Sequence, residues 1–153
     1  MIDMQKKPSL SLKRRCMGPH ATSIETLVQR AETAMERVVR EYPLFARTRL
    51  DDLRRAAETA LADSHDAQSW KALRTGLRDL QTSSAMAASP WISRFAAGLQ
   101  GELAQREASD RNLPQLAGLY FDAMQVAASD TAAQAELAEL ERKLEHAGRT
   151  LRQ

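Results

Sequence analysis

The stretch that decides the fold is residues 70–95, WKALRTGLRDLQTSSAMAASPWISRF. It predicts a helix, a break at Ser89-Pro90 and a second helix, because proline lacks an amide hydrogen and is tolerated mainly in the first helical turn. Before the break, apolar and small residues recur at intervals of three and four, the spacing of one helix face. We expect these residues to form a buried stripe: Trp70, Leu73, Leu77, Leu80, Ser84 and Ala87.

A second stripe runs beside the buried one and carries the candidate binding residues. Its members are Arg74, Arg78, Gln81, Thr82 and Ala85. Helical spacing puts them at the edge of the core, where a partner could reach them. Small residues between positions 82 and 88 would let the backbone of another protein approach closely. The sequence therefore predicts a partner-binding surface here, with no catalytic, metal-binding or cofactor-binding residue.

The composition favours an all-α fold. The chain has 153 residues, enough for one domain with a core, and 43% of them are apolar. Aromatic residues make up only 5%, so leucine and alanine must fill that core. Neither an Asn-Gly nor an Asp-Gly hairpin turn occurs, and no period-two alternation is sustained. We expect an antiparallel helical bundle over residues 22–128 and an additional leucine-rich helix over residues 129–153.

Charge is unevenly distributed along the chain. The first 22 residues contain five basic residues and one acidic residue, a net charge of +4. Since the formal net charge of the whole chain is +2, the remaining residues carry −2. A basic segment with proline and serine is typical of a disordered tail, which we expect over residues 1–21. The mildly acidic body argues against nucleic acid as a partner.

The sequence indicates a cytoplasmic protein without a membrane partner. No apolar run approaches the roughly 18 residues of a membrane span, and no signal peptide is visible. The single cysteine, Cys16, cannot form an internal disulfide, which fits a reducing compartment. Met17 stands directly before the predicted folded part, so a start at Met17 is left open and would make residues 1–16 an extension.

Two helices are expected before the central one. The first opens at Thr22-Ser-Ile-Glu25, a capping-box pattern in which Thr22 is the cap. Its buried face would be Ile24, Leu27, Val28, Ala31, Met35, Val38 and Tyr42. Pro43 then marks a new helix, whose buried face would be Ala46, Leu50, Leu53, Ala57, Ala60 and Leu61. The polar stretch 63–69 predicts a loop, in which Ser69 can cap the central helix.

Three helices are expected after the central one. Ser89 and Pro90 would begin the first, with Ile92, Phe95, Ala96, Leu99 and Leu103 facing inward. Pro114 would begin the next, which carries Leu116, Leu119, Tyr120, Ala123, Met124 and Ala127. The terminal helix has a leucine-rich stripe of Leu137, Leu140, Leu144, Ala147 and Leu151. Packing of this helix on its own bundle and pairing with another chain both fit so short a pattern.

The central pattern resembles the histidine-containing phosphotransfer (HPt) domain of bacterial phosphorelays, in particular its stand-alone alphaproteobacterial form. In that family the central helix carries His-Asp-Leu-Lys-Gly, then small residues, a glycine and a proline-led helix. Here the same spacing holds Arg78-Asp-Leu-Gln-Thr82 and small residues up to Ser89-Pro90, without insertion or deletion. Residues 30–35 and 41–53 are similar to the family's first two helices. The resemblance covers residues 24–127 and implies a four-helix HPt-like fold.

The family's reactive residues are replaced in this chain. Its phospho-accepting histidine corresponds to Arg78 and its lysine to Gln81. Its two glycines correspond to Thr82 and Ala88. An arginine side chain keeps its proton at any relevant pH and has no free lone pair, so it cannot accept a phosphoryl group. The resemblance therefore implies a phosphotransfer fold without phosphotransfer activity.

Other chemistries find little support in the residues. The three histidines, His20, His65 and His146, lie off the central helix, and we expect His65 to be a solvated loop residue. No cysteine–histidine spacing suits a metal, and neither a glycine-rich phosphate loop nor a serine-nucleophile elbow occurs. The sequence thus predicts neither an enzyme nor a cofactor-binding protein.

The favoured function is a non-catalytic adaptor of two-component signalling. As the resemblance implies, it would bind the receiver domain of a response regulator, or a sensor histidine kinase, without relaying phosphate. The alternative is a helical interaction or assembly adaptor outside phosphosignalling, which would use the leucine-rich stripe of the terminal helix. Self-association through that helix is also open.

Overall fold

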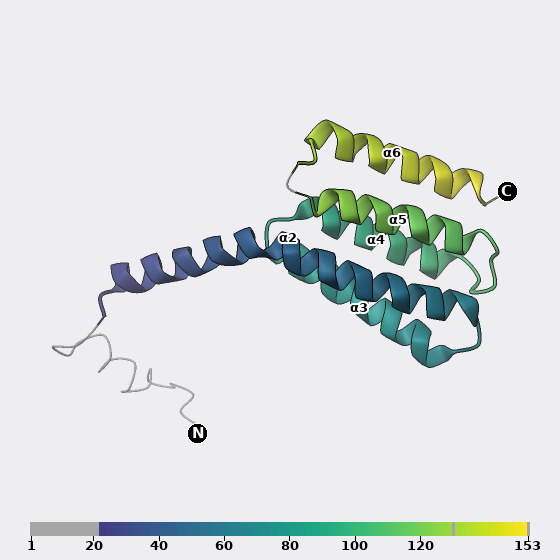
Figure 1. The fold of residues 1–153 in the computed structure, drawn as a ribbon, viewed down its shortest axis with the longest axis horizontal. Coiled ribbons are helices and arrows are strands. Elements are labelled where there is room, and N and C mark those ends of the chain that lie inside the picture. The colour runs from purple at the N-terminus through teal and green to yellow at the C-terminus, as the bar shows by residue number, and fades with distance from the viewer. Residues whose placement is uncertain (1–21, 130, 153) are drawn as a thin grey trace, which may run out of the picture. The chain divides into compact units, whose positions relative to one another are not determined.

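The computed structural model describes residues 22–129 and 131–152, and every regular element in these ranges is an α-helix. The helices are α2 Ile24–Ala62, α3 Ala67–Met86, α4 Pro90–Gln105, α5 Leu113–Ala127 and α6 Gln134–Thr150 (Figure 1). The predicted all-α class is confirmed. The expected disordered tail, residues 1–21, lies outside the described residues. None of the described helices is both long and apolar enough to cross a membrane.

Helix α2 continues through Pro43, where the sequence predicts a new helix, so that prediction is wrong. A proline inside a helix removes one backbone hydrogen bond, which weakens the helix without always ending it. Tyr42 and Ala46, on either side of Pro43, are buried. Packing therefore holds both flanks in helical conformation.

The predicted burial at the start of α2 is also wrong. The chain divides into two compact units, residues 1–38 and 39–153, and the described part of the first unit is mainly the first portion of α2. The apolar side chains of that portion are exposed, Ile24 by 72% and Met35 by 53%. Of the predicted set, only Tyr42 is buried. Periodicity identifies the apolar side of a helix but does not say whether the same chain covers it.

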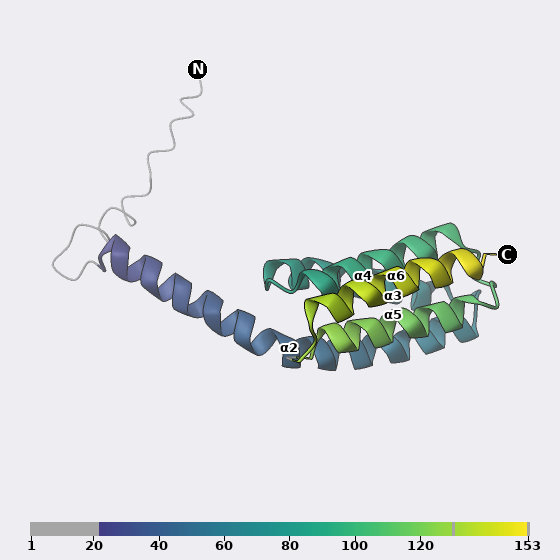
Figure 2. The same ribbon diagram turned by 90° about the horizontal axis from the view of Figure 1, so that it is seen from above.

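In the second unit, the remainder of α2 packs with α3, α4 and α5 as a bundle whose successive helices alternate in direction (Figures 1 and 2). Helix α3 packs on α4, and α4 packs on α5. The second part of helix α2 contacts both α3 and α5. Its Leu53 contacts α3 at Gly76, where a Cβ atom would collide with the leucine side chain. Its Arg54 forms an ion pair with Asp122 of α5.

The predicted buried stripe of α3 is confirmed, since all six of its residues are buried: Trp70, Leu73, Leu77, Leu80, Ser84 and Ala87. The hydroxyl of Ser84 donates to the carbonyl oxygen of Leu80 at 2.7 Å, so this polar group is buried with a hydrogen bond. The predicted inward residues of α4 are buried as well: Ile92, Phe95, Ala96, Leu99 and Leu103. In α5, Leu116, Tyr120, Ala123 and Met124 are buried, whereas Leu119 is exposed.

Two helices begin with a different cap from the predicted one. Ser23, not Thr22, caps α2, and its Oγ accepts a hydrogen bond from the amide of Thr26 at 3.1 Å. Asp66, not Ser69, caps α3. Its carboxylate accepts from the hydroxyl of Ser69 at 2.6 Å and from the amide of Ser69 at 3.2 Å. These bonds, the side-chain one first, hold the pKa of Asp66 below its usual value. A carboxylate suits this place because it also meets the positive end of the helix dipole.

Helix α6 packs on α5 and α4 of its own chain. Leu137 and Leu144 of the leucine-rich stripe are buried, and Leu140, Ala147 and Leu151 are partly buried against the core. Of the two arrangements left open by the sequence, the structure has the stripe packed in cis.

A buried arginine, Arg106, fastens the end of α6. Its side chain is only 3% exposed. It donates to four acceptors: Glu102 Oε2 at 2.8 Å, Asp110 Oδ2 at 2.9 Å, and the carbonyl oxygens of Gly148 at 2.7 Å and Leu151 at 3.1 Å. The last carbonyl groups of an α-helix have no partner within the helix, and a cation there also meets the negative end of its dipole. Arg106 therefore links α6 to α4 and to the loop that follows α4.

Replacing Leu80 by alanine should lower the free energy of unfolding by about 2–5 kcal/mol, because the side chain is 1% exposed and its loss leaves a cavity. Leu119→Ala is the matched control and should change stability by no more than about 0.5 kcal/mol, since Leu119 is on the surface. Urea denaturation followed by circular dichroism measures both. A similarly small loss of stability for both variants would show that Leu80 is not part of the core.

Replacing Arg106 by alanine should cost about 3–5 kcal/mol of stability, because Glu102 is left with Arg152 alone, and Asp110, Gly148 O and Leu151 O each lose a hydrogen-bond donor. The control is Arg142→Ala. Arg142 is exposed and pairs with Glu139 at 2.6 Å, an arrangement worth about 0–1 kcal/mol. The same denaturation experiment compares them, and equal effects would contradict the role assigned to Arg106.

Candidate functional site

Helix α3 places all five predicted site residues on one side of the bundle. The buried stripe fixes the rotation of α3 about its own axis, so the neighbouring stripe must lie away from the core. We call this surface the α3 face; it consists of Arg74, Arg78, Gln81, Thr82 and Ala85. All of these residues are exposed except Gln81, which is half-buried. The structure thus brings the predicted residues together.

A row of cations lies at the start of the α3 face. Lys71, Arg74 and Arg78 follow one another at spacings of three and four, and all three are exposed. Like charges at such spacings destabilise a helix by about 0.2–0.5 kcal/mol per pair. No carboxylate among the described residues forms an ion pair with any of the three. The row therefore presents its positive charge to the surroundings.

The two arginines of the α3 face differ in how they are held. The guanidinium carbon of Arg74 lies 5.7 Å from the centre of the Trp70 ring, within the range of a cation–π interaction. The guanidinium of Arg78 makes no ion pair or cation–π contact with any described residue. A guanidinium carries five N–H donors in a planar fork. Arg78 is the more available of the two for a partner.

The remainder of the α3 face is small and partly tied to the bundle. Gln100 Nε2 of α4 donates to Gln81 Oε1 at 2.7 Å, so Gln81 is held against α4. Thr82 Oγ1 donates to the carbonyl oxygen of Arg78 at 3.1 Å, within the same helix. Together with Ala85, these short side chains leave room beside the arginines. Because guanidinium groups supply charge and donors but no nucleophile, this surface can bind an anionic group and cannot take over a phosphoryl group through Arg78.

Helix α3 ends in a Schellman motif, which needs a residue in the left-handed conformation. The amide of Ser89 donates to Ser84 O at 2.8 Å, and the amide of Ala88 donates to Ala85 O at 3.4 Å. Ala88 has a φ of 55°, the only positive φ of a non-glycine residue in the part of the chain that the structure describes. Glycine normally occupies this position, because the conformation costs other residues about 1–2 kcal/mol. The second glycine of the HPt pattern corresponds to the same position.

Sequence reasoning missed the cluster around Arg106. A signal in the sequence was the spacing of four between Glu102 and Arg106, which puts the two side chains on one side of a helix. The amide of Asn112, and then Arg106, hold the pKa of Asp110 below its usual value. Because four hydrogen bonds within the fold already occupy the guanidinium, we assign this cluster to the structure and not to a binding site.

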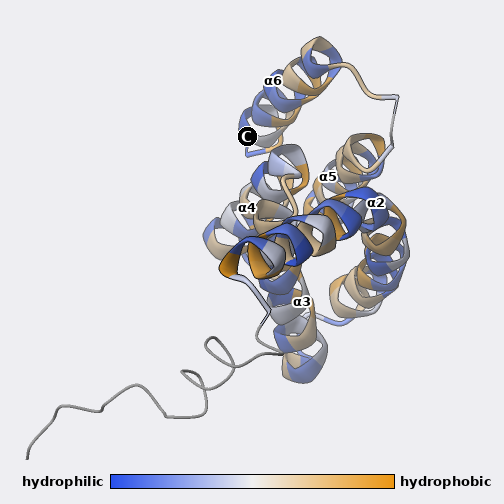
Figure 3. Ribbon diagram, turned by 90° about the vertical axis from the view of Figure 1, so that its left-hand side faces the viewer, coloured by the Kyte–Doolittle hydropathy of each residue, from blue (hydrophilic) through white to orange (hydrophobic). Residues whose placement is uncertain are grey.

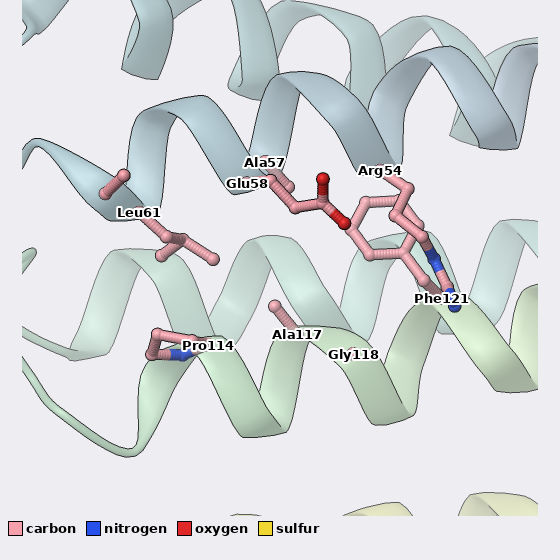
Figure 4. Close-up of a pocket in the computed structure, with 9 residues that line it drawn as sticks. Arg54, Ala57, Glu58, Leu61, Pro114, Ala117, Gly118 and Phe121 are labelled. Carbon is pink, nitrogen blue, oxygen red and sulfur yellow. The ribbon is translucent and has the colours of Figure 1, made fainter.

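A shallow groove of about 370 Å³ lies between α2 and α5 (Figure 4). Its lining is mostly apolar: Ala57, Leu61, Ala62, Pro114, Ala117, Gly118 and Phe121, with Arg54 and Glu58. The guanidinium carbon of Arg54 lies 5.7 Å from the centre of the Phe121 ring, and the same group pairs with Asp122. Since Arg54 is already engaged, the groove offers chiefly apolar contact.

The histidines lie elsewhere. His65 is exposed in the loop between α2 and α3, where its amide donates to Asp63 Oδ1 at 3.0 Å. His146 is exposed on α6, and His20 lies outside the described residues. Within the described ranges, no group of three or more His, Cys, Asp or Glu residues could hold a metal ion.

Comparisons of the chain with protein-family models, with curated proteins and with solved structures found no match. The resemblance to HPt domains over residues 24–127 therefore stays a prediction from the sequence.

Replacing Ala88 by glycine should stabilise the protein by about 1 kcal/mol, because glycine adopts the left-handed conformation without steric cost. Ala85→Gly is the matched control three residues earlier. It lies within α3 and should destabilise the protein by about 0.5–1 kcal/mol. Opposite signs in denaturant melts are expected. Destabilisation by both changes would contradict the left-handed assignment at Ala88.

Proposed function

We propose that this protein is a non-catalytic adaptor of two-component signalling, whose α3 face binds the receiver domain of a response regulator. The observation that carries the proposal is the exposed, unpaired guanidinium of Arg78 at the place where the HPt pattern has its histidine. The alternating helices of the second unit and the left-handed Ala88 support the same reading.

Charge explains why a receiver domain suits the α3 face. Receiver domains present an acidic pocket around the aspartate that they phosphorylate, and the HPt resemblance implies that position 78 would be directed at that pocket. A guanidinium can form two parallel hydrogen bonds with a carboxylate, and such charge-assisted pairs are stronger than neutral ones. Arg74 and Lys71 would add positive charge on the same side.

The size of neighbouring side chains fits a close approach. Thr82 and Ala85 are short, and both are exposed beside Arg78. A helix of the partner could therefore approach α3 closely at these two positions. Gln81, which is held by Gln100, would contribute a polar edge with little entropy to lose.

The adaptor would act by occupying the surface of the receiver domain around its acidic pocket. By covering the acidic pocket, the adaptor would exclude an active phosphotransfer protein from the same receiver. It would also stabilise whichever receiver conformation it binds more tightly, because a ligand shifts a conformational equilibrium by its difference in affinity for the two states.

The alternative, an assembly adaptor that uses the leucine-rich stripe of α6, has less support. Leu137 and Leu144 are buried against the same chain, so binding through them would require α6 to detach. The bonds of Arg106 to Gly148 and Leu151 oppose such detachment. A sensor histidine kinase is the other partner that the α3 face could serve, and the binding experiment includes it.

Replacing Arg78 by alanine should weaken binding to a cognate receiver domain by about 2–5 kcal/mol if the ion pair is desolvated in the complex, because a carboxylate is left without its partner. Arg78→Glu should weaken it further through like-charge repulsion. Isothermal titration against candidate receivers and kinases, at two salt concentrations, measures the loss. Ion pairs at the solvent-exposed rim of the interface should weaken when salt is added, whereas a desolvated ion pair should weaken less.

Arg55→Ala is the matched control for this series. Arg55 is an exposed arginine of α2, paired with Asp52 at 3.8 Å, and is not part of the α3 face. It should bind like the unaltered protein. If all variants bind a receiver equally, the α3 face is not the binding surface. Binding to kinases alone would contradict the receiver assignment.

A further inference from the structure

The start of α2 carries an apolar face that no other described part of the chain covers. Between Ile24 and Val38, apolar residues recur at intervals of three and four over about two heptads: Ile24, Leu27, Val28, Ala31, Ala34, Met35 and Val38. All of them are exposed. Strongly hydrophobic residues are visible at the beginning of α2 in Figure 3. Clustered exposed apolar residues of this kind mark interaction surfaces, whereas single ones are common on any protein.

The two edges of this apolar face carry opposite charge. At 100° per residue, Glu25, Glu32 and Glu36 lie along one edge. Arg30 and Arg37 lie along the other edge. None of the five forms an ion pair with another described residue. The face therefore has an acidic side and a basic side, and neither is neutralised within the described ranges.

We propose that the occupant of this face is the same segment of a second copy of the chain, aligned in parallel. In a parallel pair of identical helices, each edge of one helix lies beside the opposite edge of its partner. The acidic edge of each copy then meets the basic edge of the other. In an antiparallel pair, like edges meet, so acidic side chains would face acidic ones. The charge pattern thus selects both the partner and its direction.

Helix stability supports the same pairing. The stretch 24–38 continues the longer helix α2, but its apolar side chains are exposed, and most helical stability in proteins comes from packing of an apolar face. Burying the apolar residues of two copies against each other would supply the missing stabilisation. The proposed dimer interface and the α3 face share no residue, so substitutions can test one without changing the residues of the other.

Sedimentation of the full chain over a range of concentrations tests the dimer. The unaltered protein should associate into dimers. The double variant Val28→Glu with Met35→Glu should weaken association by at least about a hundredfold, because charged groups replace apolar contacts in both copies. The control Leu119→Glu, at an exposed leucine of α5, should leave association unchanged. Circular dichroism should show that the bundle of the double variant still unfolds cooperatively.

Charge exchange tests the direction. Glu25→Arg with Glu32→Arg makes both edges basic, and Arg30→Glu with Arg37→Glu makes both edges acidic. In a parallel dimer each variant alone should associate at least about tenfold more weakly than the unaltered protein, and an equimolar mixture should recover association. In an antiparallel dimer neither variant alone would be weaker.

Three results would overturn the proposal. One is an unaltered protein that stays monomeric at every concentration. Another is a Val28/Met35 double variant that associates as well as the unaltered protein. The third is a pair of charge variants that each associate without loss. Receiver binding by the α3 face is measured separately, with Arg78→Ala, and its failure would leave these sedimentation results unaffected.

Discussion

The rotation of α3 about its own axis is the constraint on which the rest of the structure depends. Burial of Leu73, Leu77 and Leu80 sets that rotation, and the contact of Gly76 with Leu53 of α2 allows the two helices to approach closely. When one face of a helix packs against the core, the opposite face must lie toward solvent. Arg74 and Arg78 are therefore exposed as a direct consequence of the apolar packing. The candidate site and the core are two results of one pattern of spacing.

The sequence predicts this part of the fold well because the information is local. Spacings of three and four within α3 and α4 identify buried residues without knowledge of their partners. At Pro43 the same reasoning fails, since the local cost of a proline is outweighed by burial of Tyr42 and Ala46 around it. It also fails at Ile24 to Val38. That stretch has an apolar side, but its spacing does not tell whether the residues that pack on it belong to the same chain or to another one.

Two further features of the structure could not be predicted from the spacing of residues alone. Arg106 joins α4 to the end of α6 through contacts with Gly148 and Leu151, which are more than forty positions away in the sequence. The left-handed conformation of Ala88 follows from the way α3 ends and turns into α4, and an alanine gives no hint of it. This feature of the fold also affects the candidate site, because the turn between α3 and α4 fixes where the small residues at the end of the α3 face lie. The protein thus offers two surfaces of different chemistry, a cationic one on α3 and an apolar one at the start of α2.

We propose that the α3 face is where a signalling partner binds. The most direct test of this proposal is nuclear magnetic resonance of isotope-labelled protein titrated with an unlabelled receiver domain, followed through backbone amide shifts. The largest changes should fall between Arg74 and Ala85, with smaller ones on the facing part of α4 near Gln100. Changes concentrated on α6 or on the groove between α2 and α5, with α3 unaffected, would contradict it.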